Sequence, residues 1–485
     1  MARESETKYD LVVRGGTVVC GMDLVAADIG IKDGIITALG RGLGPAAREV
    51  DATGRLVLPG GVDVHTHIEQ ISATGILTAD DWASATRSAV LGGTTTVLAF
   101  AAQHKGMNLR DVVTDYAGRA AAGALADYGF HLMICNPDAQ TIDHDLPQLI
   151  EEGHRSVKVF MTYDRLALSD EQLLDVMDVA RERGALVCVH AENHGMIAWK
   201  SRKLLAEGKT QPRYHAVAHD RLAEREAIRR VVDLAGMADV PLSIFHVSSR
   251  EGAAAIREAR AARSNVYAET CPQYLFTTAA DLDRPMPDAA KWMFSPPARG
   301  TEDQTALWSA LRRGDLQIVS SDHAPYALDE TGKLKNGPDA TFKEIANGIP
   351  GVGLRLVLMF DTLAKEGPRG IAAFASMTAS TPARIYGLAP AKGTIAIGAD
   401  ADLVLWDPER EQILTEESVP DATGYTPYAG RKVKGWPETV LRRGQVVADA
   451  GRVLAEPGSG RMVTRTRPEG TGQVAQRSSH GPGLA

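Results

Sequence analysis

Cysteine is scarce in this sequence. Its 485 residues contain four cysteines and no C-x-x-C pair; the four are Cys20, Cys135, Cys188 and Cys271. Cysteines so few and so widely separated do not make a disulfide framework, and they predict free thiols in a reducing cytoplasm. Three of them lie in apolar β-like runs, which favours buried, unreactive thiols.

Long apolar segments and an excess of basic residues are also lacking. No apolar run is long enough to span a bilayer, and the first ten residues, MARESETKYD, do not resemble a signal peptide. The net charge is −8 and no lysine- or arginine-rich run occurs, so nucleic acid is not an expected partner. The length allows one large barrel domain and an accessory domain.

Short β-strands are expected at both ends of the chain. Residues 9–20 (YDLVVRGGTVVC) and 27–40 (ADIGIKDGIITALG) alternate or cluster β-forming residues around Gly-Gly and Asp-Gly turns. The same pattern returns in residues 393–406 and 439–447. The two ends are therefore predicted to form one small β-domain together.

The middle of the chain alternates strand-like and helix-like segments. Between most strand-like runs lie amphipathic helix candidates such as residues 169–183, with Ser169 as N-cap and Gly184 at the C-terminal end. This alternation predicts a TIM-type (β/α)8 barrel, with a doubly wound open sheet as the structural alternative. The strand-like runs are 62–67, 94–101, 128–135, 156–163, 185–192, 242–248, 265–270 and 316–322.

Two histidines follow a Pro-Gly-Gly break at the end of the first of these runs. Residues i and i+2 of a strand point to the same side. His65 and His67 could therefore present two imidazoles to one metal ion. The alternative for an isolated pair is one hydrogen-bonded histidine and one solvated histidine, so partners elsewhere in the chain decide between the two.

Further candidates lie where other predicted strands end, which is where a TIM barrel carries its functional groups. These are Lys158 and Tyr163 on the fourth run, His190 on the fifth, His246 on the sixth and Asp322 on the eighth. A single histidine at a strand end is more often structural, but so many ligand-type residues together favour two metal ions. Two cations need an anionic bridge, whereas an ammonium such as that of Lys158 cannot bind a cation.

The motifs that carry these residues resemble those of the cyclic amidohydrolases, in the hydantoinase and dihydropyrimidinase branch. In chain order they read GGVDVHTH, KVFMTYD, VHAEN, FHVS, MFSPPAR, SDHAPY and ANGIPG. The resemblance extends from about residue 9 to residue 447. It implies a TIM-type barrel beside a small β-sandwich domain that both chain ends form, and a homotetramer or homodimer.

Domain boundaries follow from the two patterns together. Residues 1–58 and 389–455 are expected to form the β-sandwich, and residues 59–388 the catalytic barrel. Residues 456–485 contain few large apolar side chains, so they cannot fold alone. We expect them to form a polar tail that is either disordered or laid over a neighbouring subunit.

The resemblance also implies a binuclear zinc centre, or one with another divalent metal. In that family carbon dioxide converts a lysine, here Lys158, to a carbamate, and this anion bridges the two ions. Two further ligand sets are implied: His65, His67 and Asp322 for the more buried ion, and His190 and His246 for the outer ion.

The implied reaction opens a hydantoin or dihydropyrimidine ring to an N-carbamoyl amino acid. A metal-bridging hydroxide would attack the ring carbonyl, with Asp322 as general base and then acid. Tyr163 would reach the oxyanion, or else only pack at the barrel mouth. Backbone groups near Ser295 and Asn347, both in sharp-turn contexts, would bind the cyclic amide.

Glu69, two residues after His67, bears on the choice of substrate. Dihydroorotases usually have arginine there, allantoinases commonly asparagine and hydantoinases commonly aspartate. An acid would repel an anionic substrate, so a small neutral ring is expected. Residues 70–76 depart from the familiar pattern, which leaves the ring substituent undetermined, and Gly353 replaces a usual glutamate, a change that could loosen the loop carrying Asn347.

Other readings remain at this point. The chain could be an allantoinase- or dihydroorotase-like enzyme, a mononuclear deaminase-like enzyme that would not need Lys158, or a non-catalytic family scaffold. Several other histidines are expected at the surface or the pocket rim: His104, His194, His215 and His219. His323 could support Asp322 from behind or simply pack.

Overall fold

The central element is an eight-stranded parallel sheet in a computed structural model that describes residues 8–72 and 75–471. Its strands follow one another in sequence order. The first and last strands meet where Thr66 pairs with His323 and the His67 N–H donates to the His323 carbonyl at 2.7 Å. The strands are β6 (Gly61–Thr66), β7 (Thr94–Ala102), β8 (Asp127–Met133), β9 (Ser156–Phe160), β10 (Leu186–His190), β11 (Leu242–Ile244), β12 (Val266–Thr270) and β13 (Ile318–Val319).

This sheet confirms the predicted TIM-type barrel. A doubly wound sheet would change direction in its strand order and would have two free edges, whereas here sequential strands close on themselves. Every predicted strand-like run of the middle region corresponds to one barrel strand. The all-buried pattern of β6 to β10 fits parallel strands that are covered on both faces.

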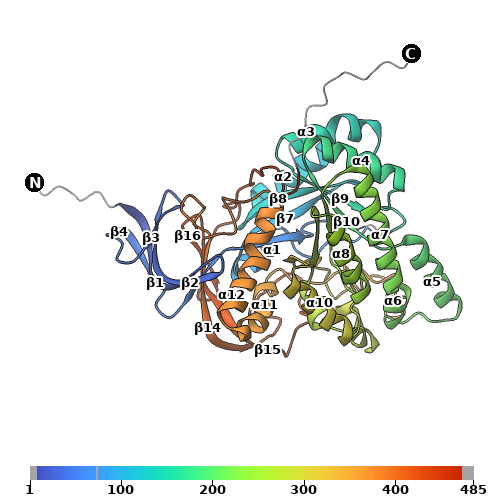
Figure 1. Cartoon of the computed structure of the whole chain (residues 1–485). Coiled ribbons are helices and arrows are strands. Elements are labelled where there is room, and N and C mark those ends of the chain that lie inside the picture. The colour runs from blue at the N-terminus through green and yellow to red at the C-terminus, as the bar shows by residue number, and fades with distance from the viewer. Residues whose placement is uncertain (1–7, 73–74, 472–485) are drawn as a thin grey trace, which may run out of the picture.

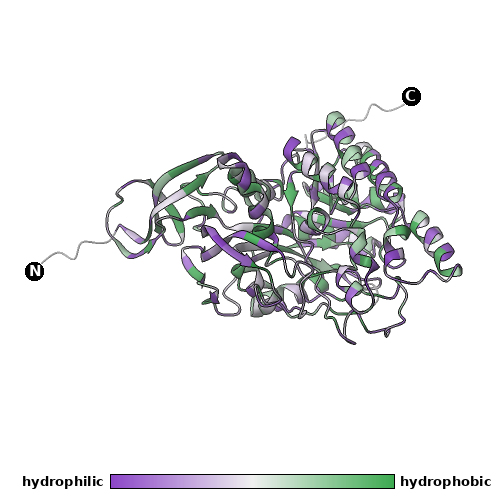
Figure 2. Cartoon of the chain, turned by 90° about the horizontal axis from the view of Figure 1, so that it is seen from below, coloured by the Kyte–Doolittle hydropathy of each residue, from purple (hydrophilic) through white to green (hydrophobic). Residues whose placement is uncertain are grey.

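Helices cover the outside of the barrel (Figure 1). Helix α4 shows how the sequence sets their limits: the Ser169 side chain accepts from the Gln172 N–H, and Gly184 ends the helix at φ +73°. Outer helices alternate hydrophobic and hydrophilic residues, while the strands beneath are mainly hydrophobic (Figure 2). The helices are α1 (Trp82–Leu91), α2 (Leu109–Gly123), α3 (Leu146–Glu151), α4 (Asp170–Arg183), α5 (His194–Ala206), α6 (Arg213–Ala218), α7 (Arg221–Ala238), α8 (Arg250–Ala262), α9 (Pro272–Phe276), α10 (Thr301–Arg313), α11 (Arg355–Leu363), α12 (Pro368–Ala375) and α13 (Thr381–Ile385).

A second sheet of nine strands lies beside the barrel and joins both chain ends. In it β14 runs antiparallel to β5, with Leu403 opposite Pro59. This pairing confirms that the two β-rich ends meet, around a small apolar core of their own. Its strands are β1 (Tyr9–Cys20), β2 (Asp23–Lys32), β3 (Ile35–Gly40), β4 (Ala46–Asp51), β5 (Leu56–Pro59), β14 (Leu403–Ile413), β15 (Lys432–Arg442), β16 (Gln445–Asp449) and β17 (Arg452–Val453).

One predicted strand is shorter than expected. The pattern indicated β-structure over residues 393–406, but β14 begins only at Leu403. Gly393 and Gly398 have φ of +75° and +91°, and these left-handed turns interrupt an extended backbone. The exact domain limits at residues 58/59 and 388/389 stay a prediction.

The described part of the tail, residues 456–471, is packed on its own barrel. It lies along the start of β8, where Val463 N–H donates to the Tyr128 carbonyl at 2.7 Å. Contact of the tail with a neighbouring subunit stays a prediction. Arg465 is buried and donates to Ser156 Oγ at 2.7 Å. The tail does not fold alone, because barrel backbone groups supply its hydrogen bonds. Residues 472–485 of the predicted tail lie outside the described residues.

Replacing Arg465 with methionine is expected to lower the free energy of unfolding by about 2–4 kcal/mol, since buried acceptors on the barrel lose their donor. Urea denaturation would measure the change. The control is Arg467→Met, an exposed position in the same segment, where a change within about 0.5 kcal/mol is expected. Equal losses in both variants would show that Arg465 does not anchor the tail.

Two expectations from what the sequence lacks can be compared with the structure. All four cysteines are free thiols, and Cys135, Cys188 and Cys271 are buried, as predicted. Among the residues that the structure describes, no helix combines the length and the apolar character needed to cross a membrane.

Candidate metal centre

A cavity of about 510 Å³ opens at the carboxyl ends of the barrel strands. It lies where the left-handed breaks after β9, β11 and β13 turn the chain away from the sheet. The cavity brings together all of the predicted site residues: His65, His67, Lys158, Tyr163, His190, His246, Ser295, Asp322 and Asn347.

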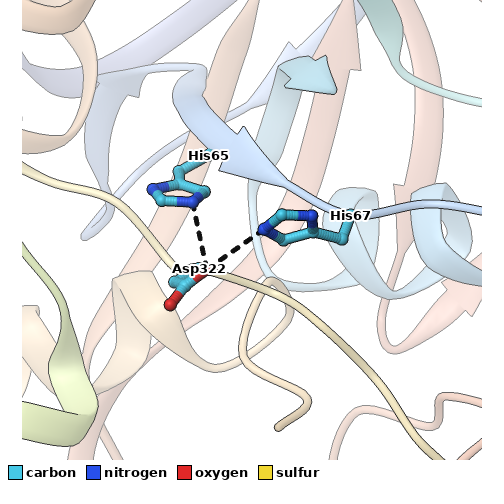
Figure 3. A group of neighbouring side chains, drawn as sticks. All are labelled: His65, His67 and Asp322. Atoms are coloured by element: carbon cyan, nitrogen blue, oxygen red, sulfur yellow. Dashed lines mark ion pairs between the residues drawn. The ribbon is translucent and has the colours of Figure 1, made fainter. Parts of the chain in front are cut away.

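His65, His67 and Asp322 form the tightest group of ligand-type side chains in this cavity (Figure 3). Asp322 Oδ1 lies 3.1 Å from His65 Nε2 and 3.4 Å from His67 Nε2. Strand β6 supplies His65, the residue directly after the strand is His67, and the segment after β13 supplies the carboxylate across the closure of the barrel. Two imidazoles and a carboxylate converging in this way are a donor set suited to zinc.

Other side chains fix the orientation of both imidazoles. His65 Nδ1 lies 2.5 Å from Glu269 Oε1, and His67 Nδ1 lies 2.7 Å from Gln70 Oε1. Each ring therefore turns its Nε2 towards Asp322, as metal-binding histidines do when a partner holds the second nitrogen. Sequence reasoning missed Glu269, although an acid inside the apolar run of β12 was the available signal.

A third carboxylate holds the barrel closure in place behind these ligands. Asp63 Oδ1 accepts from the His65 N–H at 3.3 Å and from the Ser321 N–H at 3.1 Å, and so ties β6 to the segment that carries the aspartate ligand candidate. His323 turns away from the cavity, with its Nε2 3.2 Å from Asp80 Oδ2. Of the two roles expected for His323, the structure places it behind the centre, as a support.

A second group lies beside the first. The rings of His190 and His246 are 4.3 Å apart between centroids, and those of His65 and His246 are 5.4 Å apart. His190 Nε2 lies 2.8 Å from Glu192 Oε2, which leaves its Nδ1 available to the cavity. Glu192 was quoted in a sequence motif but not recognised as a partner of a ligand candidate.

Lys158 is 1% exposed and lies among aromatic rings. Its Nζ is 4.1 Å from the centroid of Phe245 and 4.7 Å from that of Phe160. Burial lowers the pKa of Lys158 to about 8. A larger fraction of this amine is therefore unprotonated near neutral pH than for a surface lysine, and the unprotonated amine is the form that can attack carbon dioxide.

The protonation of the ligand candidates in both groups suits the binding of a cation. Burial lowers the pKa of His67, His190 and His246, which keeps these imidazoles neutral as metal ligation requires. Burial alone would lower the pKa of His65, but Asp322 and Glu269 raise it to about 9. Two buried carboxylates thus flank one imidazole, where either a proton or a metal ion balances their charge.

Three of the predicted site residues have a left-handed backbone. Tyr163, His246 and Asp322 have φ of +74°, +40° and +49°. A left-handed backbone is unfavourable for residues other than glycine, and such strain is concentrated at functional sites. Here the left-handed residues follow the ends of β9, β11 and β13, and their side chains line the cavity.

Tyr163, Ser295 and Asn347 form the end of the cavity that the resemblance assigns to substrate. The Tyr163 ring lies 5.2 Å from that of His190, and burial raises the pKa of its hydroxyl, so the group stays protonated. Ser295 Oγ lies 3.2 Å from His215 Nε2. Asn347 Oδ1 is buried with no hydrogen-bond partner among the described residues, a feature expected of a group that awaits a ligand.

The histidines expected at the surface or rim divide into two kinds. His194 is 40% exposed at the cavity mouth, where it pairs with Asp164 at 3.2 Å. His215 and His219 are buried in the cavity wall, so a surface position is wrong for both. His219 Nδ1 lies 2.9 Å from Glu192 Oε1, which links it to the second ligand group.

Glu69 does not occupy the position from which it was expected to select the substrate. Its φ of +49° turns the chain after His67, and Arg119 donates to its carbonyl oxygen at 2.7 Å. Gln70, not Glu69, belongs to the described cavity lining. Glu69 therefore does not line the described cavity, and its repulsion of an anionic substrate stays a prediction. Residues 73 and 74 of the unusual loop lie outside the described residues.

Gly353 has a packing role that the sequence did not reveal. A Cβ atom there would lie 2.3 Å from Val419 Cγ1 and 3.1 Å from the Ser88 carbonyl oxygen. Val419 fills the space that a side chain at position 353 would need. The C-terminal segment therefore packs tightly against Gly353, and the glycine does not loosen the loop near Asn347.

A closed barrel that gathers imidazoles and carboxylates at the carboxyl ends of its strands defines a class of barrel enzymes with a metal-binding active site. The chain belongs to the amidohydrolase family, whose family model matches residues 56–447. The D-hydantoinases of Ralstonia pickettii and Rhizobium radiobacter are each 41% identical over 459 residues, covering 94% of this chain and 99% of theirs.

Solved structures agree with the family assignment. A structure of a D-hydantoinase matches with a TM-score of 0.91 and 41% identity, covering 94% of this chain and 99% of that one. These likenesses confirm the expectation of a hydantoinase- or dihydropyrimidinase-type amidohydrolase, that is, a hydrolase acting on cyclic amides.

Proposed function

We propose that this chain uses two divalent metal ions, zinc by preference, to open a neutral ring of the hydantoin or dihydropyrimidine type to an N-carbamoyl amino acid. The observation that carries the proposal is the convergence of His65, His67 and Asp322 in one cavity with the buried amine of Lys158. Such a ring is a small, uncharged ligand, and the cavity end nearest Ser295 and Asn347 offers uncharged polar groups to it.

The donor groups fit such a centre. We assign His65, His67 and Asp322 to one ion and His190 with His246 to the other. His65, His67 and His190 each have one ring nitrogen held by a neighbour and turn the other into the cavity, and the His246 ring lies beside that of His190. Bound metal ions would supply an activated water molecule and polarisation of the ring carbonyl.

Lys158 is proposed to supply the anion between the two sites. Its neutral amine attacks carbon dioxide. A nitrogen–carbon bond forms as one carbon–oxygen π bond breaks, and one proton leaves the nitrogen, so the neutral amine becomes a carbamate anion. Burial among aromatic rings supports this conversion, since an ammonium in that position is poorly solvated.

Asp322 is proposed to move the proton. It accepts a proton from the attacking water and gives it to the ring nitrogen as the carbon–nitrogen bond breaks. Burial alone would raise the pKa of Asp322, but His65 and His67 hold it well below its ordinary value, so the group begins as a carboxylate. Ser295 and Asn347 would bind the cyclic amide and present its carbonyl.

Turnover of a panel of rings tests the proposal. Zinc-loaded protein is expected to open hydantoin, 5-substituted hydantoins or dihydrouracil, each followed as N-carbamoyl product. Allantoin or dihydroorotate as the preferred substrate would instead favour an allantoinase- or dihydroorotase-like enzyme. No turnover of any ring, with less than one zinc per chain, would support a non-catalytic scaffold.

Replacing Tyr163 with phenylalanine is expected to lower kcat by about 10²-fold, because a donor to the developing oxyanion is lost. Steady-state kinetics would measure it, and the zinc content should not change. If Tyr163 only packs, kcat should stay unchanged, since phenylalanine keeps the aromatic ring. An unchanged kcat in the folded variant would therefore return Tyr163 to the role of a packing residue.

Assembly and location extend the same proposal. We infer a homotetramer or homodimer from the resemblance and a cytoplasmic location from the scarcity of cysteine. Light scattering of the purified protein would measure its mass. A monomer at all concentrations would contradict this part without affecting the chemistry.

A further inference from the structure

A second buried lysine, Lys333, lies close to the substrate end of the cavity. It belongs to the segment between β13 and α11, which contains no regular helix or strand, and its side chain is 1% exposed. Lysine is rarely buried unless its polar head is satisfied. Lys333 Nζ donates to the Met293 carbonyl at 2.8 Å and to the Ala346 carbonyl at 3.0 Å.

The two acceptors are neighbours of the proposed substrate-binding residues. Met293 precedes Ser295 by two residues, and Ala346 is bonded to Asn347. The Gly348 N–H also donates to the Met293 carbonyl, at 2.9 Å. One ammonium or amine thus joins the segment that carries Ser295 to the segment that carries Asn347.

We propose that Lys333 is a positioning residue that fixes the distance between these two segments, and through it the fit of the cyclic amide. The inference rests on the proposed function. Lys333 lies behind the cavity wall, since Ser295 and Asn347 are among the described lining residues and Lys333 is not. It therefore acts through its neighbours rather than by touching the substrate.

The physical need for such a clamp comes from the length of the segment. Long loops without secondary structure have many conformations, and holding one closed requires specific anchors. Without Lys333 Nζ, the buried carbonyl of Ala346 would lose its donor, so the loop would relax to hydrate it. Asn347, the next residue, would move with that carbonyl.

Loss of the Lys333 hydrogen bonds should weaken the binding of the substrate and of the transition state equally. Lys333→Met is expected to raise KM about 10-fold and to change kcat by less than about 3-fold, the pattern of lost uniform binding. Zinc content should stay at the wild-type value, because no proposed ligand is touched. Lys333→Gln, which keeps N–H donors, is expected to show a smaller rise in KM.

Hydrogen exchange gives a readout that does not depend on activity. The amide of Gly348 is expected to exchange at least about 10-fold faster in Lys333→Met than in the wild type, because its segment opens locally. The matched control is Arg465→Met, which also removes a buried cation but at the other end of the barrel strands. It should lower stability while leaving KM and the Gly348 amide unchanged.

Two results would overturn the inference: an unchanged KM in a folded Lys333 variant, or unchanged exchange at Gly348. If Lys333→Met does not fold, the same two measurements, KM and the exchange rate of the Gly348 amide, are made on Lys333→Gln and test the inference by the same criteria. Absence of wild-type turnover would instead overturn the proposed function, while exchange at Gly348 would still test the clamp.

Discussion

Lys158→Ala is expected to reduce the metal content from two ions to less than one ion per chain and to lower kcat/KM by at least about 10³-fold. Alanine removes the proposed bridging anion, and two cations held close together without it repel one another strongly. Elemental analysis of protein grown with zinc measures the first effect, and ring opening measures the second.

Chemical rescue and a control make this test specific. Small carboxylic acids should restore part of the metal content and activity of Lys158→Ala by entering the space left by the carbamate. Lys365→Ala, at an exposed lysine on α11's C-terminal side, should match the wild type. An unchanged zinc content in Lys158→Ala would refute the bridging role and revive a mononuclear centre.

The barrel could be predicted because its strands are buried on both faces and its helices on one. Those two patterns are local, so runs such as residues 94–101 and 169–183 could be recognised without knowledge of their neighbours. The meeting of β5 with β14 was predicted from similar texture at the two ends and is a long-range pairing. The place of the tail was not predictable, since it depends on contacts between distant segments, such as those of Val463 with Tyr128 and of Arg465 with Ser156.

The candidate site was predictable as a set of strand ends, but not as a geometry. Placing His65 and Asp322 on strand ends required only the order of the strands. Glu269 was missed because its partner His65 comes from another segment, and sequence spacing does not show contacts between segments. Glu192 lies only two residues after His190, but the sequence does not show that its carboxylate turns back to that ring. Glu69 was misplaced because alternation along a strand ceases where the backbone becomes left-handed.

The structure also indicates why the first ligand group is well ordered. His65 and Asp322 come from strands that close the barrel, and Asp63 joins their backbones through two hydrogen bonds. Glu269 then holds the far side of the His65 ring. The group is therefore fixed before any ion binds, which favours metal affinity because little conformational entropy remains to be lost.

Asp322→Asn is expected to lower kcat/KM by about 10³- to 10⁴-fold, since the amide can neither accept the proton from water nor return it to the ring nitrogen. Asparagine keeps an oxygen of similar position near His65 and His67, so the metal content should fall less than in Lys158→Ala. Activity against pH measures the role. Because His65 and His67 hold the pKa of Asp322 well below its ordinary value, the acid limb of the wild type should lie below the usual range of a carboxyl group, and the variant should lose it.

Asp164→Asn is the matched control for this change. Asp164 lies at the mouth of the same cavity, is 77% exposed and pairs with His194, so the same substitution there should alter kcat/KM by less than about 3-fold. If Asp322→Asn lost activity only in proportion to its loss of zinc, Asp322 would be a ligand alone. Activity that remains low at full zinc content, together with the altered pH profile, is the result expected for a ligand that also carries the proton.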